Sequence, residues 1–377
     1  MSAEIETQSS EASQLELDER FMRVALGLSA QGLGLVSPSP LVGCVIVSPA
    51  GQIVGEGFYV YDNIDHAEKI ALDQAGREAH NATAYVTLEP HAHHGRTPPC
   101  TEALIRAGIA RVVYAIDDPN PLVAGSGGEA LCQAGLEVTT GILAHEAAHL
   151  NDAYLHFQRH GRPFVHLKMA CSLDGKIGAR RDESHWLTGD LARARVHELR
   201  HYSDAVLVGA NTAVIDDPLL TDRSGRPRRR PLVRVVLDHG LATPAGSRLV
   251  STIREAPVLI FTSSSTIVGE SHLKDTGVEI VPVSTVKIDP NEVLANLAGR
   301  GIQSVLVEGG PIIAAAFLAA GLVDKITFFI APQIIGGDGP QVIGPAALAD
   351  TARLRDVQVT RHGDDTEISG YLEELSH

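Results

Sequence analysis

The chain of 377 residues is poor in cysteine and short of positive charge. Its four cysteines, Cys44, Cys100, Cys132 and Cys171, show no spacing typical of a disulfide framework, so we expect a reducing, cytoplasmic compartment. The 31 basic residues are outnumbered by 46 acidic ones, and the formal net charge is −15. Such a surface repels phosphate backbones, which argues against a nucleic-acid partner.

Export signals and membrane-spanning segments are also lacking. Gly309–Val323 has 15 residues without a charge, whereas about 20 apolar residues are needed to cross a bilayer. We therefore predict a buried helix there and no membrane partner. Residues 1–20 carry six acidic residues and one basic residue, without the apolar core of a signal peptide. We expect this segment to be a disordered acidic tail.

The rest of the chain alternates short apolar strands with helical patterns, which is typical of α/β domains. No internal repeat is present. Residues 21–147 predict a three-layer domain around a largely parallel sheet. Its expected helices are Phe21–Gln31, His66–Ala75 and Thr101–Gly108, and its expected strands are Val42–Val47, Gln52–Tyr59, Ala84–Leu88 and Val112–Ile116.

A second α/β pattern follows a predicted linker at residues 148–163 and occupies residues 164–377. Its expected strands are Phe164–Met169, Ala205–Val208, Val233–Leu237, Val258–Phe261, Ser304–Val307 and Lys325–Ile330. The arginine-rich run 226–231 between two of these strands is interpreted as a solvated loop, with a phosphate-binding or nucleic-acid-binding patch as the alternative.

The stretch from His66 to Cys100 contains the residue types of a zinc hydrolytic deaminase. In such enzymes a histidine and two thiolates hold the metal, and a glutamate two residues after the histidine moves protons. Here His66 and Glu68 have that spacing, and Cys100 is expected at a helix start, which favours the thiolate. His91 stands where the first of the two cysteines is expected. Because His-x-Glu also occurs by chance and this stretch has one cysteine, the spacing alone leaves the zinc site open.

Further candidates lie in the second pattern, where a strand leads into the Asp174-Gly175 turn. The single tryptophan, Trp186, is either a core aromatic or part of a site. Gly309-Gly310 follows a strand and opens a helix, a turn that lets a phosphate approach backbone N–H groups, although most glycine pairs only make turns. No G-x-G-x-x-G follows a strand and no P-loop occurs, so neither a classical dinucleotide fold nor a P-loop NTPase is supported.

Taken together, these motifs resemble the RibD family of bifunctional deaminase/reductases of riboflavin synthesis. The likeness runs from about residue 20 to the C-terminal end. It rests on the family's Glu-Pro-Cys-x-His-x-Gly-x-x-Pro-Pro-Cys element and on a downstream segment at residues 118–125. The matching residues of the first element are Glu89, Pro90, His93, Gly95, Pro98, Pro99 and Cys100.

The resemblance implies a cytidine-deaminase-like N-terminal domain and a dihydrofolate-reductase-like C-terminal domain. It also implies Zn²⁺ and NADPH as cofactors and a pyrimidine ribosyl phosphate as the small-molecule substrate. By position, the metal ligands would be His66, His91 and Cys100, with Glu68 as the catalytic proton donor. The cofactor would lie at Ala170, Trp186, Thr212, Asp216, Gly310, Pro311, Ile312, Ile313, Ala314, Ala315 and Ala316. The substrate would lie at Ser184, Arg200, Leu220, Arg223 and Glu308.

Two positions depart from the family pattern: His91 replaces a cysteine, and Ser39 replaces an asparagine that helps to hold the base. Imidazole is a competent zinc ligand, so we expect zinc binding and deamination to persist. The alternative is a reductase whose first domain has lost its activity. A nucleic-acid-editing deaminase has the right zinc chemistry but leaves the second domain unexplained. The sequence specifies neither an oligomeric state, such as a homo-oligomer, nor transfer of product between the two sites.

Overall fold

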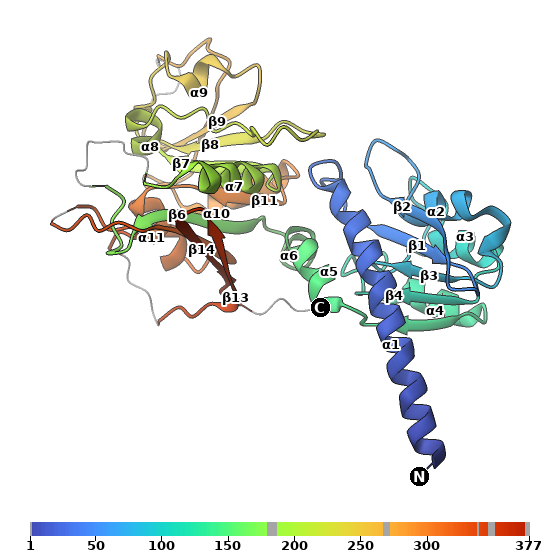
Figure 1. The fold of residues 1–377 in the computed structure, drawn as a ribbon. Coiled ribbons are helices and arrows are strands. Elements are labelled where there is room, and N and C mark those ends of the chain that lie inside the picture. Colours follow the sequence, from blue (N-terminus) through green and yellow to red (C-terminus); the bar gives the residue numbers. More distant parts are fainter. Residues whose placement is uncertain (1, 179–186, 267–271, 338, 346–350, 374–377) are drawn as a thin grey trace. The chain divides into compact units, whose positions relative to one another are not determined.

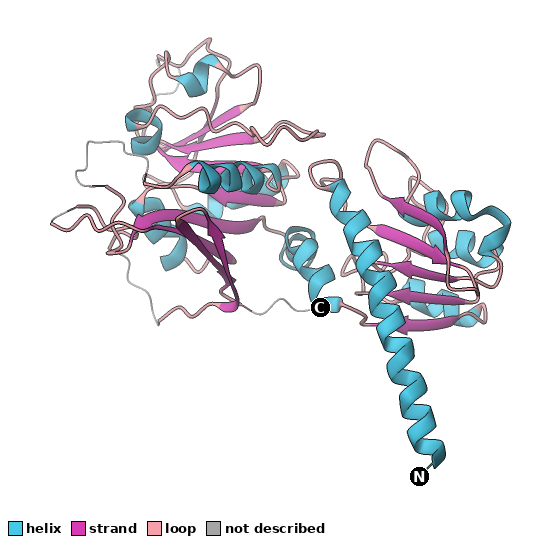
Figure 2. Ribbon diagram, viewed as in Figure 1, coloured by secondary structure: helices cyan, strands magenta, loops and turns pink. Residues whose placement is uncertain are grey.

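The computed structural model describes residues 2–178, 187–266, 272–337, 339–345 and 351–373, with backbone only for residues 2–11 (Figures 1 and 2). The chain divides into two compact units, Met1–His160 and Gly161–Glu374. None of the helices in the described ranges has the length and apolarity needed to cross a membrane.

The N-terminal domain is built on a five-stranded sheet of mixed direction. Strand order is β2-β1-β3-β4-β5, with β1 antiparallel to both β2 and β3, and β3, β4 and β5 parallel. Strands β2, β3, β4 and β5 thus run in one direction and β1 alone runs against them. The expected largely parallel sheet is therefore confirmed except at β1, which forms a hairpin with β2 around the Gly51 turn. The strands are β1 (Gly43–Val47), β2 (Ile53–Phe58), β3 (Thr83–Val86), β4 (Arg111–Tyr114) and β5 (Glu137–Thr140).

Helices cover both faces of this sheet, which confirms the three-layer architecture (Figure 2). One face packs against α1 (Ser2–Ser29), α5 (Ala144–Leu150) and α6 (Asp152–His160). The other packs against α2 (Ala67–Ala75), α3 (Cys100–Arg106) and α4 (Ser126–Gln133). Short 3-10 turns lie at Ala30–Gly32 and Gly76–Ala79.

Helix α2 lies directly on β2 because two glycines give it room. A Cβ atom on Gly55 would fall 2.0 Å from the Ala71 carbonyl oxygen, and one on Gly57 would fall 2.3 Å from the Ala67 oxygen. Any side chain at either position would push the helix away from the sheet. This close approach fixes the first turn of α2, where His66 is the N-cap residue.

The acidic N-terminal segment is helical, so the prediction of a disordered tail over residues 1–20 is wrong for the part whose side chains are described. Asp18 of α1 is 2 % exposed and binds both terminal nitrogens of Arg111 at 2.8 and 2.7 Å. The Tyr85 hydroxyl donates to the same carboxylate at 2.8 Å. A buried charge is tolerated when it is paired in this way, and the pair holds α1 against β3 and β4.

The segment expected to be a linker is also largely helical. Residues 148–160 form the end of α5 and all of α6, and they add Ala148, Tyr154 and Leu155 to the core of the first domain. The side chain of Asn151 connects the two helices to the loop before β1 by bonding the backbone N–H and C=O of Leu41. The boundary between the two compact units falls between His160 and Gly161 in the sequence, inside the predicted linker at residues 148–163.

The second unit contains a nine-stranded sheet in the order β10-β9-β8-β7-β11-β6-β12-β14-β13. The strands from β10 to β12 run parallel, and β14 and β13 add an antiparallel edge. The strands are β6 (Phe164–Ser172), β7 (Ala205–Gly209), β8 (Val233–Leu237), β9 (Val258–Thr262), β10 (Glu279–Pro282), β11 (Ser304–Val307), β12 (Lys325–Ala331), β13 (Arg355–His362) and β14 (Asp365–Tyr371). The sequence prediction missed β10, β13 and β14.

Helices again lie on both faces of the sheet. On one face are α7 (Asp190–His201), α8 (Ala210–Ile215) and α9 (Arg248–Ser251), and on the other are α10 (Pro290–Gly299) and α11 (Pro311–Ala319). The expected uncharged buried helix at Gly309–Val323 is α11, whose Phe317 is fully buried. Since parallel strands end at one edge, the C-terminal ends of β6, β7 and β11 lie together, where α/β sheets usually bind ligands.

Candidate active sites

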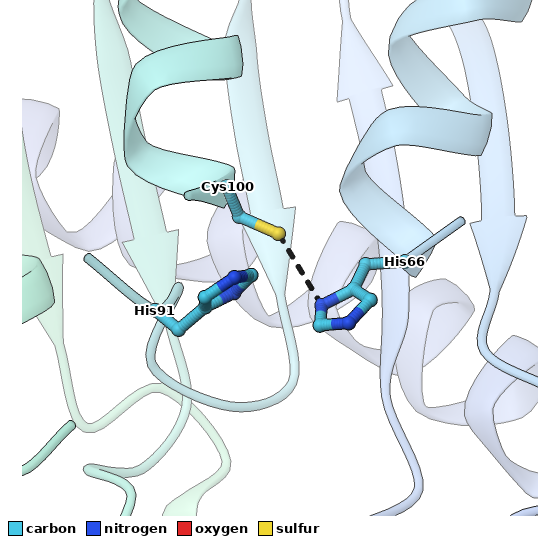
Figure 3. A group of neighbouring side chains, drawn as sticks. All are labelled: His66, His91 and Cys100. Carbon is cyan, nitrogen blue, oxygen red and sulfur yellow. Dashed lines mark hydrogen bonds between the residues drawn. The ribbon is translucent and has the colours of Figure 1, made fainter. Parts of the chain in front are cut away.

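The three predicted metal ligands of the N-terminal domain come together (Figure 3). His66 caps the start of α2, Cys100 is the first residue of α3, and His91 lies on the loop after β3. One ligand atom from each lies within 4.8 Å of the others. The three side chains thus come from two helix starts and one strand end, as the sequence predicts.

Their spacing fits a tetrahedral zinc ion. The Sγ atom of Cys100 lies 3.5 Å from Nδ1 of His66. With Zn–S of about 2.3 Å and Zn–N of about 2.0–2.1 Å, two tetrahedral ligands of these types stand about 3.6 Å apart. The ring centroids of His66 and His91 are 4.6 Å apart, so the second imidazole borders the same space. The donor set of two imidazoles and one thiol suits zinc chemically.

Glu68 is aimed at this group of donors from the first turn of α2. Its side chain is buried at 3 % exposure, and Oε2 has no hydrogen-bond partner within the described part of the chain. Burial raises the pKa of the Cys100 thiol well above its usual value, and Glu68 raises it further through its charge and a hydrogen bond. A buried carboxylate oxygen without a partner beside metal-ligand atoms is what a proton shuttle on a bound water requires.

Thr97 is part of the site although the sequence analysis assigned it no role. Its Oγ1 lies 3.3 Å from Nε2 of His66, while Nδ1 of the same ring faces Cys100. An acceptor on one ring nitrogen fixes the proton there and leaves the other nitrogen free to bind metal. Thr97 lies inside the Glu89–Cys100 element, at a position that the family motif leaves open. Its contact with His66 depends on the conformation of the loop before α3, which the sequence does not reveal.

Glu89 connects two backbone segments beside the site. It is 4 % exposed and accepts hydrogen bonds from four backbone N–H groups, those of Asp118, Gly125, Gly127 and Gly128, at 2.8–3.3 Å. Three of these groups lie at or near the start of α4, where a negative charge is favourable. The carboxylate therefore ties the strand end that carries His91 to the downstream segment 118–128.

Ser39 lies in the turn before β1, where its N–H binds the Val36 carbonyl at 2.9 Å. In the described ranges, no hydrogen bond joins it to His66, His91 or Cys100. The structure thus leaves its predicted relation to the base untested.

A second site lies at the C-terminal ends of β7 and β11 in the other domain. A Cβ on Gly209 would fall 2.9 Å from Ile313 Cγ1, and one on Gly309 would fall 2.6 Å from Ile313 Cβ. Both glycines therefore permit the starts of α8 and α11 to pack closely. Gly310 caps α11, and its Cβ position would lie 3.8 Å from Thr212 Oγ1. Adjacent helix starts with glycine turns suit a dinucleotide phosphate.

The predicted cofactor residues are unequally placed around these helix starts. Thr212 is half-buried, Asp216 is exposed at the end of α8, and Ala170 is half-buried on β6. Ile312 is 69 % exposed in the first turn of α11, whereas Ala314 is fully buried in the core. The side chain of Ala314 therefore serves packing. Trp186 and Ser184 lie outside the described residues.

Arg200 and Glu308, both predicted substrate residues, form a buried ion pair. Arg200 Nε and Nη2 donate to Glu308 at 2.5 and 3.0 Å, and Lys168 Nζ lies 3.8 Å from the same carboxylate. Burial alone would raise the pKa of Glu308, but Arg200 and Lys168 outweigh it and hold that pKa below its usual range. Burial lowers the pKa of Lys168 against the opposing effect of Glu308. Lys168, which lies on the predicted strand Phe164–Met169, is thus a residue of this cluster that the sequence did not reveal.

His197 is a second residue that sequence reasoning missed. It lies one turn before Arg200 on α7, and its buried Nδ1 has no hydrogen-bond partner in the part of the chain that the structure describes. Burial lowers its pKa, and the charges of Arg200 and Arg223 lower it further. His197 thus borders the same charged cluster as the predicted substrate residues.

The loop 216–223 beside this cluster has a strained backbone. Asp217 and Leu220 have φ angles of 39° and 52°, a region that non-glycine residues rarely adopt. Leu220 is buried at 3 % exposure, and Arg223 is exposed. Strain of this kind is often retained at binding sites.

The arginine-rich run 226–231 is less solvated than the loop interpretation predicts. Arg228 donates to the backbone carbonyls of Arg200, His201 and Ser203 at the end of α7. It also lies 3.5 Å from Asp222. A cation at the C-terminal end of a helix is stabilising, so Arg228 caps α7 from the loop.

Comparison with known proteins agrees with both domains. Residues 15–116 match the cytidine and deoxycytidylate deaminase zinc-binding region, and residues 163–368 match the RibD C-terminal domain. The fold and these matches define a two-domain enzyme in which a deaminase domain of the zinc-binding class is fused to a reductase domain. The chain belongs to the RibD family, the bifunctional deaminase/reductases of riboflavin biosynthesis, and the predicted family, fold class and enzyme class are confirmed.

The likeness extends over nearly the whole chain. Riboflavin biosynthesis protein RibD of Bacillus amyloliquefaciens is 41% identical over 358 residues, covering 94% of this chain and 96% of the relative. The structure of Acinetobacter baumannii RibD, form 1, matches with a TM-score of 0.83 at 37% identity, over 95% and 99% of the two chains. A diaminohydroxyphosphoribosylaminopyrimidine deaminase/5-amino-6-(5-phosphoribosylamino)uracil reductase from Thermotoga maritima matches with a TM-score of 0.82 at 36% identity, covering 95% and 99%.

Proposed function

We propose that both halves are active and act in sequence. The first domain removes a ring amino group of a diaminopyrimidine ribosyl phosphate as ammonia. The second reduces the ribose, opened to its aldehyde form, to a ribityl chain with NADPH. The substrate named for the Thermotoga maritima protein supports this assignment, as does the presence of two separate sites.

In the first site, His66, His91 and Cys100 would hold Zn²⁺. The bound ion supplies a hydroxide near neutral pH. Glu68 would take one proton from the attacking water and give it to a ring nitrogen. It would then carry the second proton, from the hydroxyl added to the ring carbon, to the amino group, which leaves as ammonia. The observation that carries this assignment is that Oε2 of Glu68, although buried, has no hydrogen-bond partner in the described ranges. A reducing, cytoplasmic location suits Cys100, which is a free buried thiol.

In the second site, the adjacent starts of α8 and α11 would receive the cofactor phosphates. NADPH supplies the hydride. Arg223, whose fork is exposed, would bind the ribosyl phosphate, because the fork of Arg200 is already occupied by Glu308. Glu308, held ionised by Arg200 and Lys168, would accept a hydrogen bond from the pyrimidine amino group or a sugar hydroxyl. Nδ1 of His197, which has no hydrogen-bond partner among the residues that the structure describes, would bond the same substrate.

The alternative is a reductase with a degenerate first domain, as His91 and Ser39 allow. The convergence of His91 with His66 and Cys100 favours the active form, because a site released from metal binding has no need to keep three donors within 4.8 Å.

The two half-reactions distinguish these functions when they are assayed separately on zinc-quantified protein. We expect close to one tightly bound zinc, ammonia release from the diaminopyrimidine substrate, and NADPH oxidation with the deaminated one. Glu68→Gln should abolish ammonia release while leaving zinc content and NADPH oxidation unchanged. Absence of ammonia release with NADPH oxidation intact would establish the reductase-only form, and equal loss of both activities in Glu68→Gln would refute the two-site assignment.

A further inference from the structure

Helix α5 carries a sequence whose chemistry the two reactions do not use. Residues 145–149 read His-Glu-Ala-Ala-His, which places two histidines four residues apart on one helix. Residues at this spacing are neighbours on a helix surface, and a pair of histidines so placed is a recurring metal-binding arrangement.

The two imidazoles already have the separation of two ligands on one ion. His145 Nε2 and His149 Nε2 lie 3.1 Å apart, and their ring centroids lie 4.2 Å apart. With metal–nitrogen bonds of about 2.0–2.1 Å, this separation corresponds to a nitrogen–metal–nitrogen angle of about 95–102°. That value lies between the ideal octahedral and tetrahedral angles, so binding needs little rearrangement of either side chain.

The two histidines lie on the more exposed side of α5, and the other side of this helix packs in the core. Ala147 and Ala148 are fully buried in the core of the first domain, whereas His145 is exposed and His149 is half-buried. The backbone under the pair is thereby fixed, which lowers the entropy cost of holding two ligands in one geometry. The exposed position leaves room for water molecules to complete the coordination of the metal.

We propose that His145 and His149 form a second divalent transition-metal site, specific for ions that accept imidazole nitrogen, such as Zn²⁺ and Ni²⁺. It is separate from the donors of the deaminase centre, none of which belongs to α5. Because its two histidines are not joined by a thiolate, it binds zinc more weakly than that centre. The proposal is that this site binds a metal ion; it includes no catalysis of hydrolysis.

Equilibrium dialysis of the full chain against Zn²⁺, after removal of metal by a chelator, tests the site. Wild type should bind one zinc tightly and a second at least tenfold more weakly. His145→Gln/His149→Gln should lose only the second, and Cys100→Ser should lose only the first. His156→Gln/His160→Gln, with the same spacing on α6, is the matched control and should keep both.

The results separate this site from the deaminase centre. Equal zinc and Ni²⁺ uptake by wild type and His145→Gln/His149→Gln, both folded by circular dichroism, would overturn the proposal, as would loss of the weaker ion in the α6 control alone. Loss of the tight ion in every preparation would count against the deaminase assignment and leave the α5 site standing. One consequence is that total zinc above one equivalent reports α5 and not the active site.

Discussion

Arg200 on α7 binds both carboxylate oxygens of Glu308, which follows β11, through hydrogen bonds of 2.5 and 3.0 Å. The two residues are 108 positions apart in the chain, and both are almost fully buried. The guanidinium therefore orients the Glu308 carboxylate, which we propose binds the substrate, instead of facing solvent.

Replacing the planar fork tests that role. Arg200→Lys keeps the charge but cannot bind both carboxylate oxygens. A hydrogen bond to a charged group contributes about 1.5–3 kcal/mol, so kcat/KM for NADPH-dependent reduction should fall by about 10–100-fold. Ammonia release should not change. Arg162→Lys is the matched control, since Arg162 binds Asp324 in the same two-point manner at the start of β6. A similar loss in both variants would contradict a site-specific role.

His197 should affect substrate binding more than cofactor binding. His197→Ala removes the nitrogen that has no partner in the described structure, so we expect the KM for the deaminated substrate to rise about tenfold, the loss of one hydrogen bond. The dissociation constant for NADPH, measured by fluorescence titration, should stay unchanged. His197→Asn should recover part of the affinity. Equal weakening of NADPH and substrate binding would indicate a merely structural side chain.

Thr97 should set the metal affinity of the first site. Thr97→Val keeps the shape but removes the oxygen that lies 3.3 Å from His66 Nε2. Loss of such an outer partner typically lowers metal affinity about 10–100-fold. Zinc transfer to a chromogenic chelator measures the change, and Thr97→Ser should behave like wild type. Unchanged zinc retention in Thr97→Val would show that the hydroxyl does not orient the ring.

Glu89→Gln should destabilise the first domain and impair deamination. The amide has one acceptor oxygen for four backbone N–H groups, so at least two bonds to a charge are lost, at a cost of about 3 kcal/mol or more. Urea unfolding followed by circular dichroism measures this. Glu102→Gln, at an exposed position on α3, should change stability by less than about 0.5 kcal/mol. Comparable midpoints for the two variants would refute the role given to Glu89.

Asp18→Asn should release the N-terminal helix. It removes the buried negative charge that faces Arg111, although Glu137 remains 3.0 Å from Arg111 Nε. We expect the free energy of unfolding to fall by about 3 kcal/mol. Thermal unfolding and the rate of proteolysis within α1 both report the change. Glu19→Gln, which affects only an exposed pair with Arg23, serves as control. Unaltered proteolysis in Asp18→Asn would mean that other contacts hold the helix.

The sequence predicted the parts of both sites that depend on local spacing. His66 and Glu68 share one helix turn, and Cys100 starts the next helix, so their convergence follows from periodicity and from the family motif. Thr97 and Glu89 could not be assigned in this way, because their partners are set by loop conformation. The same holds for Arg200, whose pairing with Glu308 depends on how α7 packs on the sheet.

The fold errors have a similar origin. Residues 1–20 look like a polar tail because their charge pattern shows no partner, yet Asp18 meets an arginine 93 residues away. The predicted linker is helical, and its Ala148, Tyr154 and Leu155 pack into a core made of residues far away in the sequence, which local spacing does not reveal. Strands β13 and β14 were missed because β13 is exposed along most of its length and has little apolar alternation.

The order of strands in the second sheet has a consequence for synthesis of the chain. Strand β6 begins at Phe164, but its two neighbours, β11 and β12, begin at Ser304 and Lys325. About 130 residues must therefore leave the ribosome before β6 acquires either partner, and its apolar face stays uncovered during that time. The N-terminal domain has all its strands by Thr140 and can close earlier. Because pairing over long sequence distances is slow, we expect the reductase half to be the part that needs chaperone protection.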